Sequence, residues 1–245
     1  MKIKVINPNT TQSMTDVIAA AARSVAAPGT EIIAVSPRHG PASIEGHYDE
    51  AVSVLGVLDE VRAGERSGVD GYVIACFGDP GLLAARELAS GPVIGIAEAA
   101  MHTASLVATG FSVVTTLTRS CIIAEHLVAA YGMTHACRGV HGTDLAVLDF
   151  GRPESDAYRV VLGRCRHALA ADRSGAIVIG CAGMADLCGR LRDELGVPVI
   201  DGVTAAVKLA ESLIALGLRT SKVGDLAFPI PKTYAGELAR YAFAS

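Results

Sequence analysis

A strand, a cysteine, a glycine and a helix occur in the same order twice along this chain. The segment at 71–100, GYVIACFGDPGLLAARELASGPVIGIAEAA, aligns with the segment at 175–206, GAIVIGCAGMADLCGRLRDELGVPVIDGVTAA, when small gaps are allowed. Cys76 and Cys181 occupy matching positions, and each is followed by a glycine and then by a helical pattern. Such a repeat predicts two α/β lobes that are related by a pseudo-twofold axis.

Apolar runs of strand length alternate with helical periodicity through both halves, as in βαβ units. We expect strands at 3–7, 31–35, 71–75, 92–96, 111–116, 143–148, 176–180 and 197–200. We expect helices near 14–27, 46–63, 79–89, 98–109, 119–131, 154–171, 184–194 and 203–217. The predicted fold class is therefore α/β, with a short parallel sheet flanked by helices in each lobe.

The repeat also sets the expected lobe boundaries. The first lobe should comprise 1–97 together with the C-terminal tail 209–245, and the second should comprise 98–208. The Pro-rich part of the tail, AFPIPKTY at 227–234, should return to the first lobe. Because parallel α/β sheets bind ligands beyond the carboxyl ends of their strands, we expect the active site in the cleft between the lobes. The loops that should reach this cleft are 7–11, 76–81, 115–119 and 181–186.

The charge pattern indicates a small-molecule partner. The formal net charge is −4, and no cluster of lysine and arginine is longer than a pair, so neither nucleic acid nor an acidic membrane is an expected partner. The N-terminus becomes polar after Ile6, too early for a signal peptide, and no apolar run reaches the ~18 residues of a membrane span. We expect a cytoplasmic protein. The apolar content of 51% and alanine-rich helices such as 14–27 predict a homo-oligomer.

The sequence carries no cofactor or metal motif. It has neither a G-x-G-x-x-G turn nor a Walker A loop, and neither of the central lysines, Lys208 and Lys222, follows a strand as a Schiff-base lysine would. The seven histidines lack HxH or HExxH spacing, and the six cysteines lack a CxxC pair. We therefore expect no cofactor, no metal and no disulfides.

Cys76 and Cys181 are the candidate catalytic residues. Each lies at the carboxyl end of an apolar strand and precedes a predicted helix, whose N-terminus would lower the thiol pKa from about 8.5 toward neutrality. Two such groups on opposite faces of a flat carbon intermediate can invert a stereocentre. One thiolate removes the proton, and the other thiol returns a proton from the opposite side.

The backbone N–H groups that follow the two cysteines are placed to hold the oxygen of an enolate intermediate. They belong to Phe77, Gly78, Ala182 and Gly183. The alternative interpretation is a pair of buried, purely structural cysteines. The corresponding alternative from a different functional class is a non-catalytic two-lobe protein that binds a small molecule in its cleft.

Six motifs follow one another along essentially the whole chain: INPNTT (6–11), GPASIEGHYDEA (40–51), ACFGDPG (75–81), VTTLTRS (114–120), GCAGM (180–184) and PVIDGV (198–203). Together they resemble the hydantoin and allantoin racemases of the aspartate/glutamate racemase superfamily. The amino-acid racemases of that superfamily usually carry Cys-Asn-Thr and Cys-Thr-His at the two cysteines. This chain has Cys76-Phe77-Gly78 and Cys181-Ala182-Gly183, so an amino-acid substrate is not expected.

The resemblance implies a cofactor-independent racemase of 5-substituted hydantoins that removes and returns the proton at C5, with Cys76 and Cys181 as its catalytic pair. The alternative within the family is an allantoin racemase of purine catabolism. The substrate-binding residues implied by the resemblance, or expected to shape the C5 pocket, are Asn9, Thr10, Ser43, Ile44, Phe77, Gly78, Asp79, Thr116, Thr118, Ala182 and Gly183. Asn9 and Thr10 have a second interpretation as caps of the following helix.

Overall fold

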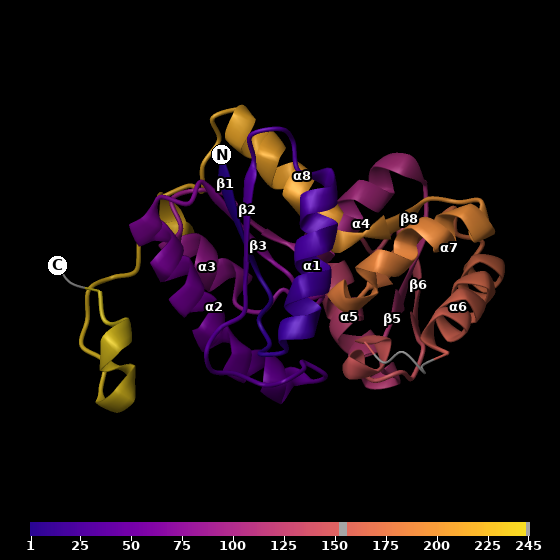
Figure 1. Cartoon of the computed structure of the whole chain (residues 1–245), viewed down its shortest axis with the longest axis horizontal. Coiled ribbons are helices and arrows are strands. Elements are labelled where there is room, and N and C mark those ends of the chain that lie inside the picture. The colour runs from indigo at the N-terminus through magenta and orange to yellow at the C-terminus, as the bar shows by residue number, and fades with distance from the viewer. Residues whose placement is uncertain (152–155, 244–245) are drawn as a thin grey trace.

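The computed structural model describes residues 1–151 and 156–243, and within these the chain forms two α/β lobes that lie side by side (Figure 1). In the described residues each lobe contains a parallel sheet of four strands. The first sheet has the order β2-β1-β3-β4, and the second has the order β6-β5-β7-β8, which is the same order shifted by four strands. This equivalence confirms the predicted fold class.

The strands of the first lobe are β1 (Lys2–Ile6), β2 (Glu31–Val35), β3 (Gly71–Ile74) and β4 (Val93–Gly95). Those of the second lobe are β5 (Phe111–Thr115), β6 (Cys137–Gly142), β7 (Ala176–Gly180) and β8 (Val199–Asp201). The strands β3 and β7 are buried along their whole length, as expected for central strands covered on both faces. Their apolar sequences are the clearest strand signals in the chain.

Helices connect the strands and cover the sheets. They are α1 (Gln12–Val25), α2 (His47–Ser67), α3 (Leu82–Leu88), α4 (Ile96–Val107), α5 (Thr118–Ala130), α6 (Ala157–Asp172), α7 (Cys188–Leu195) and α8 (Gly202–Ala215). Gly68 ends α2 in the left-handed conformation, with a φ of 69°, and its N–H group closes onto the last turn. Glycine adopts this conformation without the steric cost that a Cβ would bring.

Two helices cross from one lobe to the other. The apolar face of α4 packs with Phe111 and Val113 of the second sheet, although α4 directly follows the first sheet. Conversely, α8 packs with Ile3 and Val5 of the first sheet, and Figure 1 shows it beside that lobe. The helices α4 and α8 also pack against each other. This exchange ties the lobes together, while the division at residues 97 and 98 stays a prediction.

One predicted strand is wrong. The sixth strand is β6, Cys137–Gly142, rather than 143–148, and residues Val147–Gly151 form a 3-10 turn. β6 lies at the edge of its sheet, and most of its residues are partly exposed, so its sequence lacks the continuous apolar run of a central strand. The predicted helix at 154–171 corresponds to α6, and its first two positions lie outside the described residues.

The C-terminal tail runs along the outside of the first lobe (Figure 1). The Lys222 ammonium donates hydrogen bonds to the carbonyl oxygens of Arg86 and Glu87 on α3. On α2, Arg62 donates to the carbonyl oxygen of Arg240. Within the described residues, no helix combines the length and the apolar character needed to cross a membrane.

Candidate active site

A pocket lies between the lobes, at the carboxyl ends of the central strands. Residues from four loops line it: Asn9 after β1, Cys76 after β3, Thr116 after β5 and Cys181 after β7. These four loops are the ones that the sequence predicted for the cleft. Since both sheets present their carboxyl ends to this pocket, the repeat places its two cysteines in one site.

The Cys76 thiol is half-buried and lines the pocket. Burial raises its pKa to about 12, because a thiolate loses solvation when it is taken out of water. The backbone N–H group of Gly78 acts in the opposite direction, since it donates a hydrogen bond to the sulfur. The N–H group of Gly78, which we expected to hold an enolate oxygen, therefore stabilises the thiolate in this structure.

The Cys181 thiol is buried, with 9% of the residue exposed, and lines the same pocket. Burial raises its pKa to about 11, and a hydrogen bond from the backbone N–H group of Gly183 lowers it. Each thiol is thus supported by the N–H group of the glycine two residues further along. This local geometry is repeated in the two halves.

The expected fall of the thiol pKa values toward neutrality is wrong for this structure. The reason is that α3 begins at Leu82 and α7 at Cys188, so neither cysteine lies in the first turn of an α-helix. The field of a helix N-terminus fades within about one turn, so desolvation determines the pKa of both thiols. Only a 3-10 segment, Ala182–Leu187, directly follows Cys181.

The two thiols also influence each other. A charge on Cys181 raises the pKa of Cys76, although burial is the larger cause. In a coupled pair of this kind, removal of one proton makes removal of the second more difficult. The coupling therefore disfavours the state in which both sulfurs are thiolates, while the raised pKa values of about 12 and about 11 keep both thiols protonated near neutral pH.

Two carboxylates line the pocket that were not among the predicted site residues. Glu50, whose pKa is raised mainly by burial, raises the pKa of Cys76 through its charge. Glu45 acts in the same direction on Cys181, and its Oε1 accepts a hydrogen bond from the N–H group of Val147, 2.8 Å away in the second lobe. The charge of Asp79 also raises the pKa of Cys76, so two carboxylates act on Cys76 and one acts on Cys181.

Comparisons with known proteins identify the family. The model of the Asp/Glu/Hydantoin racemase family matches residues 3–210. The chain belongs to this family. A hydantoin racemase from Rhizobium meliloti is 52% identical over 236 residues, which cover 96% of this chain and 98% of that protein.

Solved structures of family members match the whole architecture. An allantoin racemase from Klebsiella pneumoniae is 61% identical, with a TM-score of 0.97 and 99% of both chains covered. An allantoin racemase from Pseudomonas fluorescens is 40% identical, with a TM-score of 0.93, covering 96% of this chain and 100% of that chain. The chain is therefore a racemase, an isomerase that acts on a small molecule, and this finding sets aside the alternative of a non-catalytic binding protein.

The racemase pocket contains many of the residues that the sequence predicted for substrate binding. Those that line it are Asn9, Ile44, Phe77, Gly78, Thr116 and Ala182. The Asn9 side chain also organises its own loop, because its Oδ1 accepts a hydrogen bond from the N–H group of Thr11, the residue before α1. The N-cap of α1 is Thr11, so the interpretation of Asn9 and Thr10 as caps of this helix is wrong, whereas Asn9 does line the pocket.

The other predicted residues lie around the pocket without lining it. Thr10 donates from its N–H and hydroxyl groups to the carbonyl oxygen of Pro41, and Ser43 is partly exposed in the same loop. Thr118 begins α5 and donates from its N–H and hydroxyl groups to Asp144. Gly183 reaches the site through its N–H group, as described above. Asp79 is directed away from the pocket and toward α4.

Several pocket residues were missed by the sequence analysis. They are Met14, Glu45, Gly46, Glu50, Ala75, Thr115, Ser120, Ile123, Ala124, Val147 and Gly180. Glu45, Gly46 and Glu50 belong to the motif at 40–51, and the negative charges of Glu45 and Glu50 were the available signal. Within the part of the chain that the structure describes, no three histidine, cysteine or acidic side chains are grouped so that they could hold a metal ion.

Proposed function

We propose that this racemase inverts the C5 centre of hydantoins by a two-base mechanism in which Cys76 and Cys181 are the bases. The observation that carries the proposal is the placement of two equivalent thiols, one from each half of the repeat, in one pocket between the lobes. In each direction a thiolate takes the proton from C5, and the electron pair of the C–H bond moves into the adjacent carbonyl to give an enolate. The opposite thiol then donates its proton to the other face. At the end of the reaction the sulfur that took the proton is a thiol, and the sulfur that donated its proton is a thiolate.

The lining of the pocket favours an uncharged substrate rich in N–H groups. Among the described residues that line it none is basic, whereas Glu45 and Glu50 are acidic. An amino-acid carboxylate would be repelled by these side chains, whereas ring and side-chain N–H groups can donate hydrogen bonds to them. This supports a hydantoin ring over a free amino acid.

We propose allantoin, a hydantoin with a ureido group on C5, as the preferred substrate. Its ureido group offers further N–H donors to Glu50, which lies beside Cys76. The Klebsiella relative, which is 61% identical over nearly the whole chain, is an allantoin racemase. Hydantoins with alkyl or aryl groups on C5 are the second candidate, because the Rhizobium relative is a hydantoin racemase.

Polarimetry on separate enantiomers of allantoin and of alkyl and aryl hydantoins tests both parts of this proposal. We expect racemisation of both allantoin enantiomers in EDTA with no added cofactor, and a lower kcat/KM for hydantoins that lack the ureido group. The doubly substituted Cys76→Ser/Cys181→Ser protein is the matched control for spontaneous racemisation. Loss of optical activity at the control rate for every compound would reject the proposed function.

The pH dependence of kcat/KM should follow the formation of the thiolate. Since the pKa values of Cys76 and Cys181 are raised to about 12 and about 11, a small fraction of either is ionised at neutral pH. We expect kcat/KM to rise with pH between about 7 and 9, by up to roughly tenfold per unit, because the thiolate fraction grows in this proportion below the pKa. The measurement is a pH profile on one pure enantiomer, corrected for spontaneous racemisation. A flat profile over this range would mean that the reacting thiolate is already formed at pH 7.

The surface of α2 supports the proposal that the enzyme is a homo-oligomer. Tyr48, Val52 and Leu55 are exposed at helical spacing on this helix. An apolar stripe on a helix surface suits contact with a second copy of the chain. We also propose a cytoplasmic location, because six cysteines without a disulfide framework suit a reducing compartment.

A further inference from the structure

The two halves of the repeat cap their crossing helices in different ways. In the second half, Asp201 is the N-cap of α8, and its carboxylate accepts hydrogen bonds from the N–H groups of Val203 and Thr204, both at 2.9 Å. The matching position in the first half is Gly95, the N-cap of α4, which has no side chain to do this. A carboxylate nevertheless caps α4, and it comes from Asp79.

Asp79 reaches α4 from the Cys76 loop. Its Oδ1 accepts a hydrogen bond from the N–H group of Ala97 at 3.1 Å, and its Oδ2 accepts one from the N–H group of Glu98 at 3.0 Å. A Cβ atom built on Gly95 would overlap the Asp79 carboxyl group. Glycine at position 95 therefore makes room for a carboxylate that belongs to another segment.

The backbone does not explain why position 95 lacks a side chain. Gly95 has φ −81° and ψ 144°, and Asp201 has φ −91° and ψ 131°, so the two N-cap residues have nearly the same conformation. The repeat position that matches Asp79 in the second half is Met184, which is fully buried in an apolar cluster. In the second half the capping carboxylate therefore belongs to the N-cap residue of the helix, whereas in the first half it belongs to the cysteine loop.

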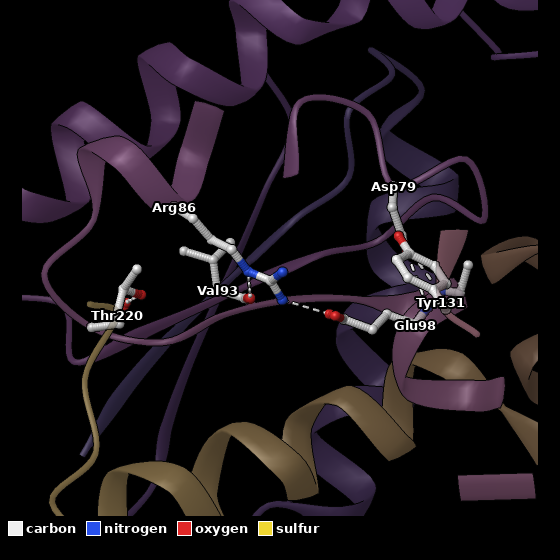
Figure 2. A network of polar contacts seen from close by, with 8 residues as sticks. Asp79, Arg86, Val93, Glu98, Tyr131 and Thr220 are labelled. Atoms are coloured by element: carbon white, nitrogen blue, oxygen red, sulfur yellow. Dashed lines mark hydrogen bonds and ion pairs between the residues drawn. The ribbon is translucent and has the colours of Figure 1, made fainter. Parts of the chain in front are cut away.

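A third donor fixes Asp79 from the second lobe. The hydroxyl group of Tyr131, directly after α5, donates to Oδ2 at 2.7 Å, and Figure 2 shows the ring of Tyr131 against the carboxyl group. The network continues through Glu98, whose Oε2 lies 2.6 Å from Nη2 of Arg86. Burial raises the pKa of Asp79 to about 7, while these three donors favour its ionised form.

The backbone at Asp79 connects this anchor to Cys76. The N–H group of Asp79 donates to the carbonyl oxygen of Cys76 at 3.0 Å and closes a tight turn. Asp79 has a φ of 45°, in the left-handed region that residues other than glycine seldom occupy. Such a conformation persists where surrounding contacts determine it, and the contacts of the carboxyl group do so here.

We propose that Asp79 is a positioning residue for Cys76, which holds this thiol, and not Cys181, at the correct place in the site. The proposal rests on the proposed two-base function. The loops of the two equivalent cysteines are then held in different ways. The Asp79 carboxylate holds the Cys76 loop, whereas apolar packing at Met184 holds the Cys181 loop. Loss of Asp79 should therefore impair the reaction of one enantiomer more than that of the other.

Three variants separate positioning from helix capping. Asp79→Gly removes both the anchor and the cap of α4, and glycine accepts the left-handed conformation of this position. Asp79→Gly/Gly95→Asp gives α4 its own N-cap, as Asp201 gives α8, in the space that the Asp79 side chain leaves, and the Cys76 loop stays unanchored. Tyr131→Phe removes one of the three donors and is the mildest change.

Each variant is combined with Cys181→Ser to report on Cys76, and with Cys76→Ser to report on Cys181. The readouts are solvent-deuterium exchange at C5 of each pure enantiomer by NMR, and the midpoint of thermal unfolding. With Cys76 as the remaining active-site thiol, we expect Asp79→Gly to slow exchange by roughly 10²-fold, because a small misplacement of a reacting group has an effect of this size. With Cys181 as the remaining thiol, the change should be several times smaller. Tyr131→Phe should give a weaker loss on the Cys76 side.

The double variant decides between the two roles. We expect Asp79→Gly/Gly95→Asp to recover the unfolding midpoint lost in Asp79→Gly without recovering exchange by Cys76. If it recovers both, or if exchange by the two thiols falls equally in Asp79→Gly, Asp79 acts as a helix cap and the proposal is overturned.

A separate readout keeps this outcome distinct from failure of the two-base function. The alkylation rates of Cys76 and Cys181 by iodoacetamide, followed by mass spectrometry, need no turnover. If the parent single-serine variants show no enantiomer-selective exchange, the two-base function fails. A selective fall of the Cys76 rate in Asp79→Gly/Gly95→Asp would still support the positioning role, because loss of the Asp79 charge alone would lower the pKa of Cys76 and raise this rate. A Cys76 rate equal to or above that of the parent would overturn it.

Discussion

Replacement of either pocket cysteine by serine is expected to abolish racemisation and to leave exchange at C5 for one enantiomer only. A serine hydroxyl has a pKa far above neutrality, so one side of the proton relay is lost, and general acid–base groups of this kind contribute about 10²- to 10⁴-fold to a rate. Cys76→Ser retains the Cys181 thiolate, and Cys181→Ser retains Cys76 on the opposite side. The two variants should therefore exchange the proton of opposite enantiomers for deuterium.

The measurement is NMR of pure D- and L-substrate in deuterated buffer, corrected for spontaneous exchange at alkaline pH. Cys137→Ser is a suitable control, because Cys137 is a partly exposed thiol on the edge strand β6 that does not line the pocket. It should racemise both enantiomers at nearly the wild-type rate. Wild-type racemisation by either pocket variant, or loss of exchange for the same enantiomer in both, would show that the thiols are not two opposed bases.

The fold was predictable to the extent that its signals are apolar and periodic. The central strands β3 and β7 are buried along their length and read as continuous apolar runs, and the repeat identified them as equivalent. The edge strand β6 has a mixed sequence, because only part of its surface is covered, so it was placed several residues too late. The packing of α4 on the second sheet and of α8 on the first could not be predicted from the spacing of apolar residues. A helix shows the same apolar face in its sequence whichever sheet it packs on.

The site was predictable where the position along a strand determines it. That Cys76 and Cys181 line one pocket was predictable, because the carboxyl ends of the strands in parallel sheets meet at one edge. The pKa values of the two thiols could not be predicted, because they depend on how deeply each thiol is buried and on where the next α-helix begins. Each of these helices begins several residues later than its sequence pattern indicates. Asp79 was placed in the substrate pocket by its motif, whereas a left-handed backbone conformation turns its side chain toward α4.

The packing of α4 against α8 depends on a glycine at the start of α8. A Cβ atom at Gly202 would overlap the carbonyl oxygen of Ile96 and lie 2.9 Å from the Cβ of Ile96. Ile96 is the residue that matches Gly202 in the first half of the repeat, so a large and a small residue meet where the two equivalent helices begin. Because the obstructing atom belongs to the backbone, a change of side chain at position 96 cannot relieve the overlap.

Gly202→Val is therefore expected to be one of the most destabilising single substitutions in this enzyme. Overpacking of a tight contact costs about 1–3 kcal/mol and occasionally more, against a total stability of about 5–15 kcal/mol. The substitution should also force the lobes apart at the helices that join them, and so displace Cys76 relative to Cys181 and lower kcat. Urea unfolding and racemisation assays measure the two effects.

The matched control is Gly189→Ala on α7, where an added Cβ meets open space. This change should stabilise the protein by up to about 1 kcal/mol through helix propensity. An unfolding midpoint of Gly202→Val at or above that of the wild type would show that the lobes can move apart at this crossing without cost.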